Sequence, residues 1–190
     1  MCGRGFGRVA RLIKESGKNR MKIVLITPAP ARSRLGNRRT ALRWARMLRE
    51  LGHRVVIEEE YRGLRCDVLV ALHARRSFRS IARFRRKHPD APLIVALTGT
   101  DLYRDIRTDP KAQRSLAMAS RIVVLQPLGV KELSAHLRER ARVIIQSAER
   151  PRGAASPREE VFEVCVMGHL RPVKDPFRAA KAARLLPGSS

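Results

Sequence analysis

Short apolar runs that alternate with longer amphipathic stretches constrain the fold of this chain most strongly. Strands that are buried on both faces read as continuous apolar runs, and they belong mainly to parallel sheets covered by helices. The pattern therefore predicts an α/β protein with a doubly wound parallel sheet, a Rossmann-like domain. Six runs rich in Val and Ile are the expected strands: 23–27, 54–58, 67–72, 93–97, 121–125 and 142–146.

Four segments between these runs have the spacing and the end signals of helices. Parallel neighbouring strands require crossover connections, which such helices supply. We expect helices over 38–51, from Ser77 to about Lys87, over 109–119, and from near Pro127 to 137. The expected end signals are caps at Asn37, Ser77 and Asp109, Pro110 in a first helical position, and a stop at Gly52.

The rest of the chain divides into a leader, a linker and the start of a second domain. Residues 1–20 are basic and lack the apolar centre of a secretory signal, so we expect a disordered tail and favour a translation start at Met21. A basic helix on a membrane surface is the less favoured reading of this leader. We expect a first domain over 21–148, a linker over 149–160, and the first strand and helix of a truncated α/β domain over 161–190.

The composition is strongly basic, with 41 Lys and Arg against 17 Asp and Glu and a formal net charge of +24. Such charge attracts nucleic acid, anionic lipid headgroups or phosphorylated small molecules, unless the arginines only cover solvated helix faces. Aromatic residues make up 4%, few for stacking on bases, so we expect no specific nucleic-acid partner.

Neither the apolar runs nor the cysteines indicate a membrane span or a metal site. No apolar stretch reaches the roughly 18 residues of a membrane-spanning helix, which leaves peripheral membrane contact open. Cys2, Cys66 and Cys165 are too few and too scattered for a disulfide framework or a zinc site. We therefore expect a cytoplasmic protein without a metal.

Polar residues directly after the predicted strands are the candidate site residues, because open parallel sheets bind ligands at the carboxyl ends of their strands. They are Gly36, Asn37, Arg38 and Arg39 after the first strand, His73, Arg75 and Arg76 after the third, and Thr98, Gly99, Thr100 and Asp101 after the fourth. In the second unit, Gly168, Arg171 and Lys174 resemble a diphosphate clamp before a helix.

Each candidate also has a structural interpretation. Gly36 and Asn37 fit an ordinary capped turn, and a lone histidine such as His73 is often structural. Asp101 fits a cap over the following turn, with Gly99 at a positive φ angle. The cations of the second unit fit ordinary surface charge.

Several motifs in order resemble a known family. They are "TPAP", "GNRRTALRWARMLRELGHRV", "LVALHARRS", "ALTGTDLYRD", "VVLQPLG" and "VCVMGHLRPVKDPFRAA". Together they resemble the retaining glycosyltransferases of the GT-B fold, the family 4 class, and more narrowly the selenosugar synthases of selenoneine biosynthesis. The resemblance extends over 21–186 and implies transfer of a sugar from a UDP-sugar to selenophosphate, giving a 1-seleno-sugar, without a metal or other cofactor.

The resemblance also implies roles for single residues. Gly36 and Asn37 match the loop that approaches the donor phosphate and the acceptor, and Lys174 the lysine that binds the donor diphosphate. His73 matches the histidine near the sugar and is the expected catalytic residue, a titratable base beside Arg75 and Arg76. The usual arginine after Gly168 is replaced by His169, which leaves Arg171 as the substitute.

Other positions depart from the family. The family often has a histidine at the position of Thr98. Its paired glutamates, seven residues apart, have no match in this chain, so we expect an N-terminal fragment that binds the donor weakly.

The charge pattern suggests how an anionic acceptor is held. Arg38, Arg39, Arg75 and Arg76 are expected to form a pocket for selenophosphate, an inference from the charges and not from the family. Three alternatives stay open: a related glycosyltransferase with a lipid or glycan acceptor, a basic nucleic-acid-binding α/β protein, and a truncated remnant without catalytic activity.

Overall fold

A computed structural model describes residues 20–148, 153, 160, 162–166 and 175–186. The chain divides into two compact units, Met1–Ser147 and Ala148–Ser190, and each is described by itself. Candidate residues Gly168, Arg171 and Lys174 lie outside the described residues, as does the predicted leader up to residue 19.

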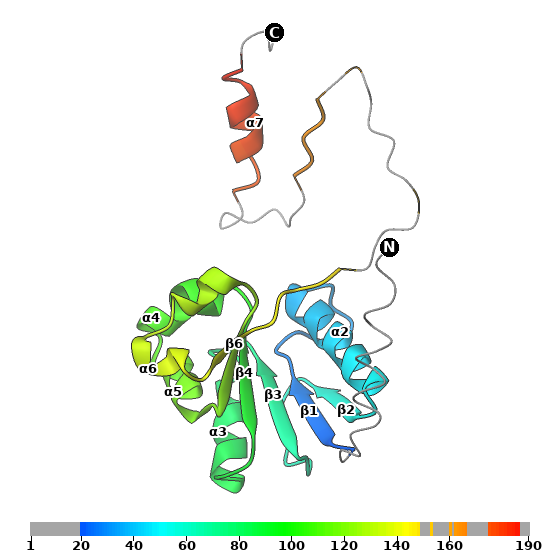
Figure 1. The fold of residues 1–190 in the computed structure, drawn as a ribbon, viewed down its shortest axis with the longest axis vertical. Helices are drawn as coiled ribbons and strands as arrows, with labels where there is room; N and C mark the ends of the chain where they lie inside the picture. Colours follow the sequence, from blue (N-terminus) through cyan, green and yellow to red (C-terminus); the bar gives the residue numbers. More distant parts are fainter. Residues whose placement is uncertain (1–19, 149–152, 154–159, 161, 167–174, 187–190) are drawn as a thin grey trace. The chain divides into compact units, whose positions relative to one another are not determined.

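The first unit is built on a six-stranded parallel sheet with strand order β2-β1-β3-β4-β5-β6 (Figure 1). The prediction of a doubly wound α/β fold with a parallel sheet is confirmed. The chain moves from β1 to one edge and then returns past β1 to build the other side, so the strand order reverses between β1 and β3. The strands are β1 (Lys22–Ile26), β2 (Arg54–Glu58), β3 (Val68–Leu72), β4 (Leu93–Leu97), β5 (Arg121–Val124) and β6 (Ala141–Val143).

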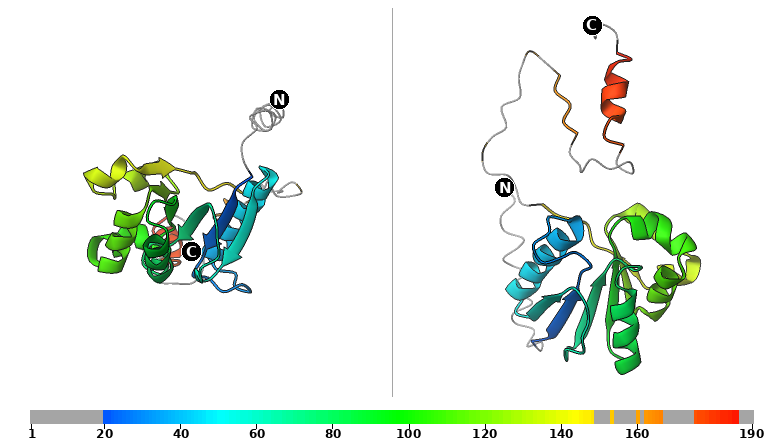
Figure 2. Two further views of the ribbon diagram at one scale, coloured as in Figure 1. Left: turned by 90° about the horizontal axis from the view of Figure 1, so that it is seen from below. Right: turned by 180° about the vertical axis from the view of Figure 1, so that it is seen from behind.

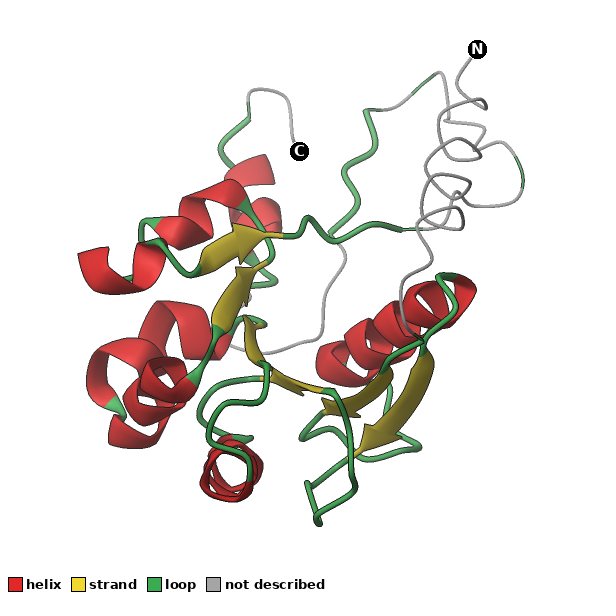
Figure 3. Ribbon diagram, turned by 60° about the horizontal axis from the view of Figure 1, so that its bottom comes forward, coloured by secondary structure: helices red, strands yellow, loops and turns green. Residues whose placement is uncertain are grey.

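Helices cover both faces of this sheet (Figures 2 and 3). Right-handed crossovers that run in opposite directions place their helices on opposite faces. For this reason α2 (Gly36–Glu50) lies on one face, while α3 (Phe78–Lys87) and α5 (Pro110–Met118) lie on the other. The remaining elements of this unit are a π-helical turn η1 (Asp101–Asp105), α4 (Ile106–Thr108), a 3-10 turn η2 (Pro127–Val130) and α6 (Ala135–Arg138).

Alternate residues of the four inner strands supply two separate cores. On β1, Ile23 and Leu25 pack toward α2, whereas Val24 and Ile26 pack toward α3 and α5. All four side chains are at most 3% exposed. This double burial is the physical reason why β3 and β4 are apolar throughout and why β1 and β5 are apolar after their first residue.

Two of the predicted helix ends are confirmed. Asp109 caps α5, because its carboxylate accepts hydrogen bonds from the amides of Lys111 (2.8 Å) and Ala112 (3.3 Å). Gly52 has φ +91° and ends α2: its amide donates to the Arg49 carbonyl, and the amide of the next residue donates to the Leu48 carbonyl. Those two bonds form a Schellman motif, which favours glycine at the left-handed position.

Three predictions about helix ends are wrong. Asn37 does not cap α2, because the helix begins one residue earlier and Leu35 holds the cap position without a side-chain bond. Ser77 holds the cap position of α3, but its hydroxyl donates to the Leu72 carbonyl at 2.7 Å instead of capping. The single helix expected from Pro127 is interrupted, since the structure has η2 and α6 there with a turn between them.

Tyr61 covers the sheet where no helix connects β2 to β3. Its side chain is 1% exposed, and its ring centroid lies 5.3 Å from that of Phe84 in an edge-on arrangement. The hydroxyl lies 3.1 Å from His88 Nε2, so the polar end of the ring is hydrogen-bonded. Burial raises the pKa of the Tyr61 hydroxyl, and the charge of the nearby Cys66 thiolate raises it further.

Arg85 of α3 joins the loops at the amino ends of β4 and β5. Its guanidinium donates to the carbonyls of Met118 (2.7 Å from Nη2), Pro89 and Ala91 (3.1 Å), and to the Ser120 hydroxyl (3.3 Å). A planar fork with several donors suits this arrangement, and an ammonium group does not reproduce it.

The second unit contains α7 (Arg178–Ala183), which lies within the range 161–190 where a first strand and helix are expected. The expected strand at the start of this range is absent from the described residues 162–166. Phe162 is 95% exposed and Val164 65%, and neither lies beside a neighbouring strand among the described residues. An isolated extended segment has no ladder of backbone hydrogen bonds, which explains this difference.

Candidate functional site

The predicted site segments meet at the carboxyl edge of the sheet. Strand β3 pairs with β1 on one side and with β4 on the other, so the three segments that follow these strands are neighbours. Strand order reverses between β1 and β3, and in open parallel sheets the crevice at such a reversal is the usual ligand site. The topology thus places the candidates after β1, β3 and β4 where a ligand is expected.

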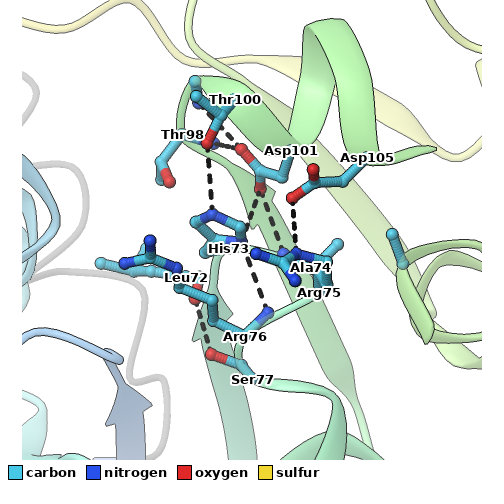
Figure 4. A network of polar contacts seen from close by, with 12 residues as sticks. Leu72, His73, Ala74, Arg75, Arg76, Ser77, Thr98, Thr100, Asp101 and Asp105 are labelled. Atoms are coloured by element: carbon cyan, nitrogen blue, oxygen red, sulfur yellow. Dashed lines mark hydrogen bonds and ion pairs between the residues drawn. The ribbon is translucent and has the colours of Figure 1, made fainter. Parts of the chain in front are cut away.

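His73 follows β3 directly and has an unusual backbone conformation. Its φ is +71°, in the left-handed region, and the residue is 5% exposed (Figure 4). Its amide donates to the Ala96 carbonyl of β4 at 2.9 Å. A non-glycine residue in this region costs on the order of 1 kcal/mol, and such residues cluster at functional sites.

Several buried hydrogen bonds keep the segment after β3 in place. The Ser77 hydroxyl donates to the Leu72 carbonyl at 2.7 Å, and the Ser77 amide donates to the His73 carbonyl at 3.0 Å. From α5, the Ser115 hydroxyl donates to the Ala74 carbonyl at 2.8 Å. The segment is therefore fixed from both sides, and the imidazole is preorganised.

Asp101 joins the segments after β3 and β4. Its Oδ1 accepts the amides of Thr98 (3.0 Å) and Gly99 (2.9 Å), and its Oδ2 accepts the amide of Ala74 (3.1 Å). The residue is completely buried. Gly99 has the positive φ that the sequence predicted, at +151°. Asp101 thus holds the turn before it and the neighbouring loop. The prediction that it caps the following turn is wrong, because Asp101 lies inside η1 and Thr100 holds the cap position.

The imidazole of His73 is held in its neutral form. Nδ1 lies 3.4 Å from the Arg76 amide nitrogen and 3.8 Å from Asp101 Oδ2, and Nε2 lies 3.5 Å from Thr100 Oγ1. When Nδ1 accepts the Arg76 amide, the hydrogen of the neutral ring is on Nε2. Burial lowers the pKa of His73, and the charges of Arg76 and Arg75 lower it further, while Asp101 and Asp105 oppose them. His73 therefore presents an N–H donor suited to a sugar oxygen, and it is a weak base.

Arg75 is bound by carboxylates of this chain. Its Nε lies 3.0 Å from Asp105 Oδ2 and 3.8 Å from Asp109 Oδ2. Burial alone would raise the pKa of Asp105, but hydrogen bonds from Arg104 and Arg75 outweigh it, so that the pKa is lowered. Arg75 thus positions the loop that carries His73. Its Nε is paired with carboxylates of this chain and is not available to an anionic ligand.

Sequence reasoning missed Asp105. A signal was present, because Asp105 follows Asp101 by four residues, and this spacing places both on one side of a helical turn. Both carboxylates face the segment after β3 (Figure 4).

The other predicted arginines lie in different surroundings. Arg76 is exposed beside His73, and its guanidinium forms no ion pair with the described residues. Arg38 lines a pocket of about 360 Å³ together with Glu58, Glu59 and Glu60. Arg39 is exposed on α2. The structure thus does not bring the four arginines into one pocket.

Three buried polar atoms on segments after β1 and β4 have no hydrogen-bond partner. They are Ser33 Oγ, Arg38 Nε and Thr98 Oγ1, and the described residues contain one more such atom, His53 Nδ1. Polar atoms left unpaired in an interior cost about 1–3 kcal/mol each, and ligand sites are a common reason for keeping them.

The two glycines of the site leave room for a ligand. A methyl group built on Gly36 or on Gly99 would meet nothing within 4 Å. Crowding by the described residues therefore does not explain why position 36 is glycine. At both positions a ligand can approach the backbone closely.

The described residues contain no group of three or more His, Cys, Asp or Glu that could hold a metal ion. Within the same ranges, every helix is too short or too polar to cross a membrane. No protein-family model matches the chain, and no curated protein matches it. The roles of the candidate residues are therefore argued from geometry and chemistry.

Proposed function

We propose that this chain supplies the acceptor-binding domain of a GT-B glycosyltransferase that transfers a sugar from a UDP-sugar to selenophosphate. One observation carries the proposal: a buried His73 in a left-handed conformation, with Nε2 3.5 Å from Thr100 Oγ1, at the carboxyl ends of two adjacent parallel strands, the second of which is followed by Thr98. A fixed N–H donor and two hydroxyls are groups that bind sugar hydroxyls, and their position matches the ligand crevice of such sheets.

The acceptor chemistry agrees with a weakly basic histidine. Selenium of selenophosphate is already a good nucleophile, so its attack needs positioning and charge stabilisation more than proton removal. The lowered pKa of His73 suits it to donate a hydrogen bond from Nε2 to the sugar. Arg76, exposed beside it, is the cation best placed for the phosphoryl oxygens of selenophosphate.

The proposed reaction forms one bond at the anomeric carbon and breaks another. Selenium attacks C1 of the sugar, the bond from C1 to the diphosphate oxygen breaks, and UDP leaves with the electron pair. Water then attacks phosphorus, the P–Se bond breaks, and phosphate and the 1-seleno-sugar are released. The resemblance gives Gly168, Arg171 and Lys174 to the UDP diphosphate, and this role stays a prediction, as does a cytoplasmic location.

Mass spectrometry of products tests the proposal directly. The chain, alone and extended through a donor-binding domain, is incubated with a UDP-sugar and selenophosphate, and a product with the selenium isotope pattern is expected from the extended form together with UDP. We expect Thr98→Val and His73→Ala to lower its formation at least tenfold, because each removes a polar group from the sugar site. Arg79→Gln is a matched control, since Arg79 is an exposed arginine in the first turn of α3.

A binding measurement keeps the proposal testable if turnover is slow. Titration of the chain with selenophosphate, followed by ³¹P NMR, should show saturable broadening that Arg76→Gln weakens and Arg79→Gln does not. Neither a seleno-sugar nor saturable binding would overturn the proposal. Equal activity of the wild type and the Thr98→Val and His73→Ala variants would refute the placement of the site.

A further inference from the structure

The solvent side of α2 carries alternating leucines and arginines. Leu35, Arg39, Leu42 and Arg46 are separated by four, three and four residues, a spacing that places them on one side of a helix. We call these four residues the leucine–arginine stripe. Leu35 is 44% exposed, Leu42 is 45% exposed, and the Arg46 side chain is 53% exposed.

The opposite side of α2 already supplies its packing. Ala41 and Ala45 are completely buried against the sheet, with Trp44 and Leu48 packed beside them. A surface helix usually needs apolar residues only on the side that faces the core. The leucines of the stripe are therefore not needed to hold α2 on this domain.

The charge around the stripe is positive and poorly suited to the helix itself. Exposed Arg32 and Arg34 precede α2, while Arg38 and Arg39 lie in its first turn, which contains no acidic residue. The amino end of a helix carries partial positive charge, so arginines there are unfavourable for the helix. Glu50 lies 3.6 Å from Arg46 at the far end, and Glu58, Glu59 and Glu60 line a pocket with Arg38. An anionic partner beside Arg39 would offset the remaining positive charge on the stripe.

We propose that the leucine–arginine stripe docks this protein on an anionic lipid surface. Leucines inserted between headgroups and arginines paired with lipid phosphates are the two contributions by which a helix binds in the plane of a membrane interface. A nucleic acid fits less well, because the stripe offers no aromatic ring for stacking. The inference rests on α2 and is independent of the proposed reaction.

Vesicle co-sedimentation tests this docking. The chain is mixed with vesicles of phosphatidylcholine alone or with about 30% phosphatidylglycerol, at physiological salt. We expect binding to the anionic vesicles and a roughly tenfold loss of affinity in the double variant Leu35→Gln/Leu42→Gln, which leaves the charge unchanged. The matched control Leu64→Gln/Leu128→Gln removes two leucines, 38% and 61% exposed, from other surfaces.

A second pair of variants separates the stripe from general basic charge. Arg39→Gln should weaken binding to anionic vesicles several-fold. Arg79→Gln, an equivalent change in the first turn of α3 on the other face of the sheet, should not. Emission from Trp44, the single tryptophan, reports whether each variant is folded.

Three outcomes would overturn the proposal. The first is no binding to anionic vesicles, and the second is equal weakening by Arg39→Gln and Arg79→Gln. The third is preferential binding of duplex or single-stranded nucleic acid that the stripe variants weaken. A loss of affinity confined to the stripe variants would support it.

Discussion

Replacing Asp101 by asparagine removes one charge from the centre of the site and changes little else in size. In the wild type, the two carboxylate oxygens accept three backbone amides at 2.9 to 3.1 Å, and the residue is completely buried. An asparagine oxygen can serve two of those amides, but its NH₂ group then faces the Ala74 amide, donor against donor. The opposite rotamer is worse, because the NH₂ group would face the amides of Thr98 and Gly99.

The size of the loss follows from these contacts. A hydrogen bond to a charged group contributes about 1.5–3 kcal/mol, and a buried donor left unpaired costs about 1–3 kcal/mol. We therefore expect Asp101→Asn to lower the free energy of unfolding by about 3 kcal/mol. With a urea slope of about 2 kcal/mol/M, the unfolding midpoint should fall by about 1.5 M.

Urea unfolding followed by Trp44 fluorescence measures this shift. Asp109→Asn is the matched control, because Asp109 also accepts two amides but its side chain is 26% exposed, and asparagine is a good cap. Its midpoint should move by no more than about 0.3 M. A shift for Asp101→Asn as small as that of the control would refute the reasoning.

The same variant also separates positioning from catalysis. If Asp101 only holds the loops, the folded Asp101→Asn protein keeps most of its kcat at low temperature. A fall of more than about a hundredfold in the folded protein would instead assign its carboxylate to the chemistry.

Three further predictions concern other groups. The pKa of His73 is lower in the folded protein than in the unfolded chain, so below about pH 6.5 the unfolded chain binds a proton that folded His73 does not bind. The free energy of unfolding should therefore rise with pH up to about 6.5. His73→Gln should flatten this rise in urea titrations at several pH values. Burial raises the pKa of the half-buried Cys66 thiol, so at pH 8 we expect it to react with a thiol reagent at least about tenfold more slowly than exposed Cys165, as cysteine-to-serine variants would show. Arg85→Lys should lower the free energy of unfolding by about 2 kcal/mol, and the same change at exposed Arg86 by less than about 0.5 kcal/mol, both measured by urea unfolding.

The four inner strands were predictable because their burial on both faces dictates their composition, and edge strand β2 because Val55, Val56 and Ile57 form an apolar run. The runs 54–58 and 93–97 coincide with β2 and β4 residue for residue. Strand β6 is shorter than the predicted 142–146, because its residues beyond Val143 extend past the neighbouring strand β5. The length of an apolar run reflects how many residues are hydrophobic, whereas the length of a strand depends on how far the neighbouring strand extends.

The site was predictable in its location and not in its contacts. Parallel strands bring their carboxyl ends together, so His73 and Thr100 were expected at one edge, and they lie within 3.5 Å. The pairing of Arg75 with Asp105 depends on how two loops 30 residues apart approach each other. The local sequence pattern does not indicate which residues 30 positions apart come into contact. Arg75 was therefore predicted to be a free cation.

The left-handed backbone of His73 restricts which sequences this position can accept. Glycine adopts φ near +71° without strain, and asparagine and aspartate reach it more easily than most residues. A β-branched residue there would force the loop after β3 to rearrange, whatever its side chain could bind. In a random library at this position, folded variants should consequently be enriched in glycine, asparagine, aspartate and histidine. The backbone thus limits the residue at this position before any ligand is bound.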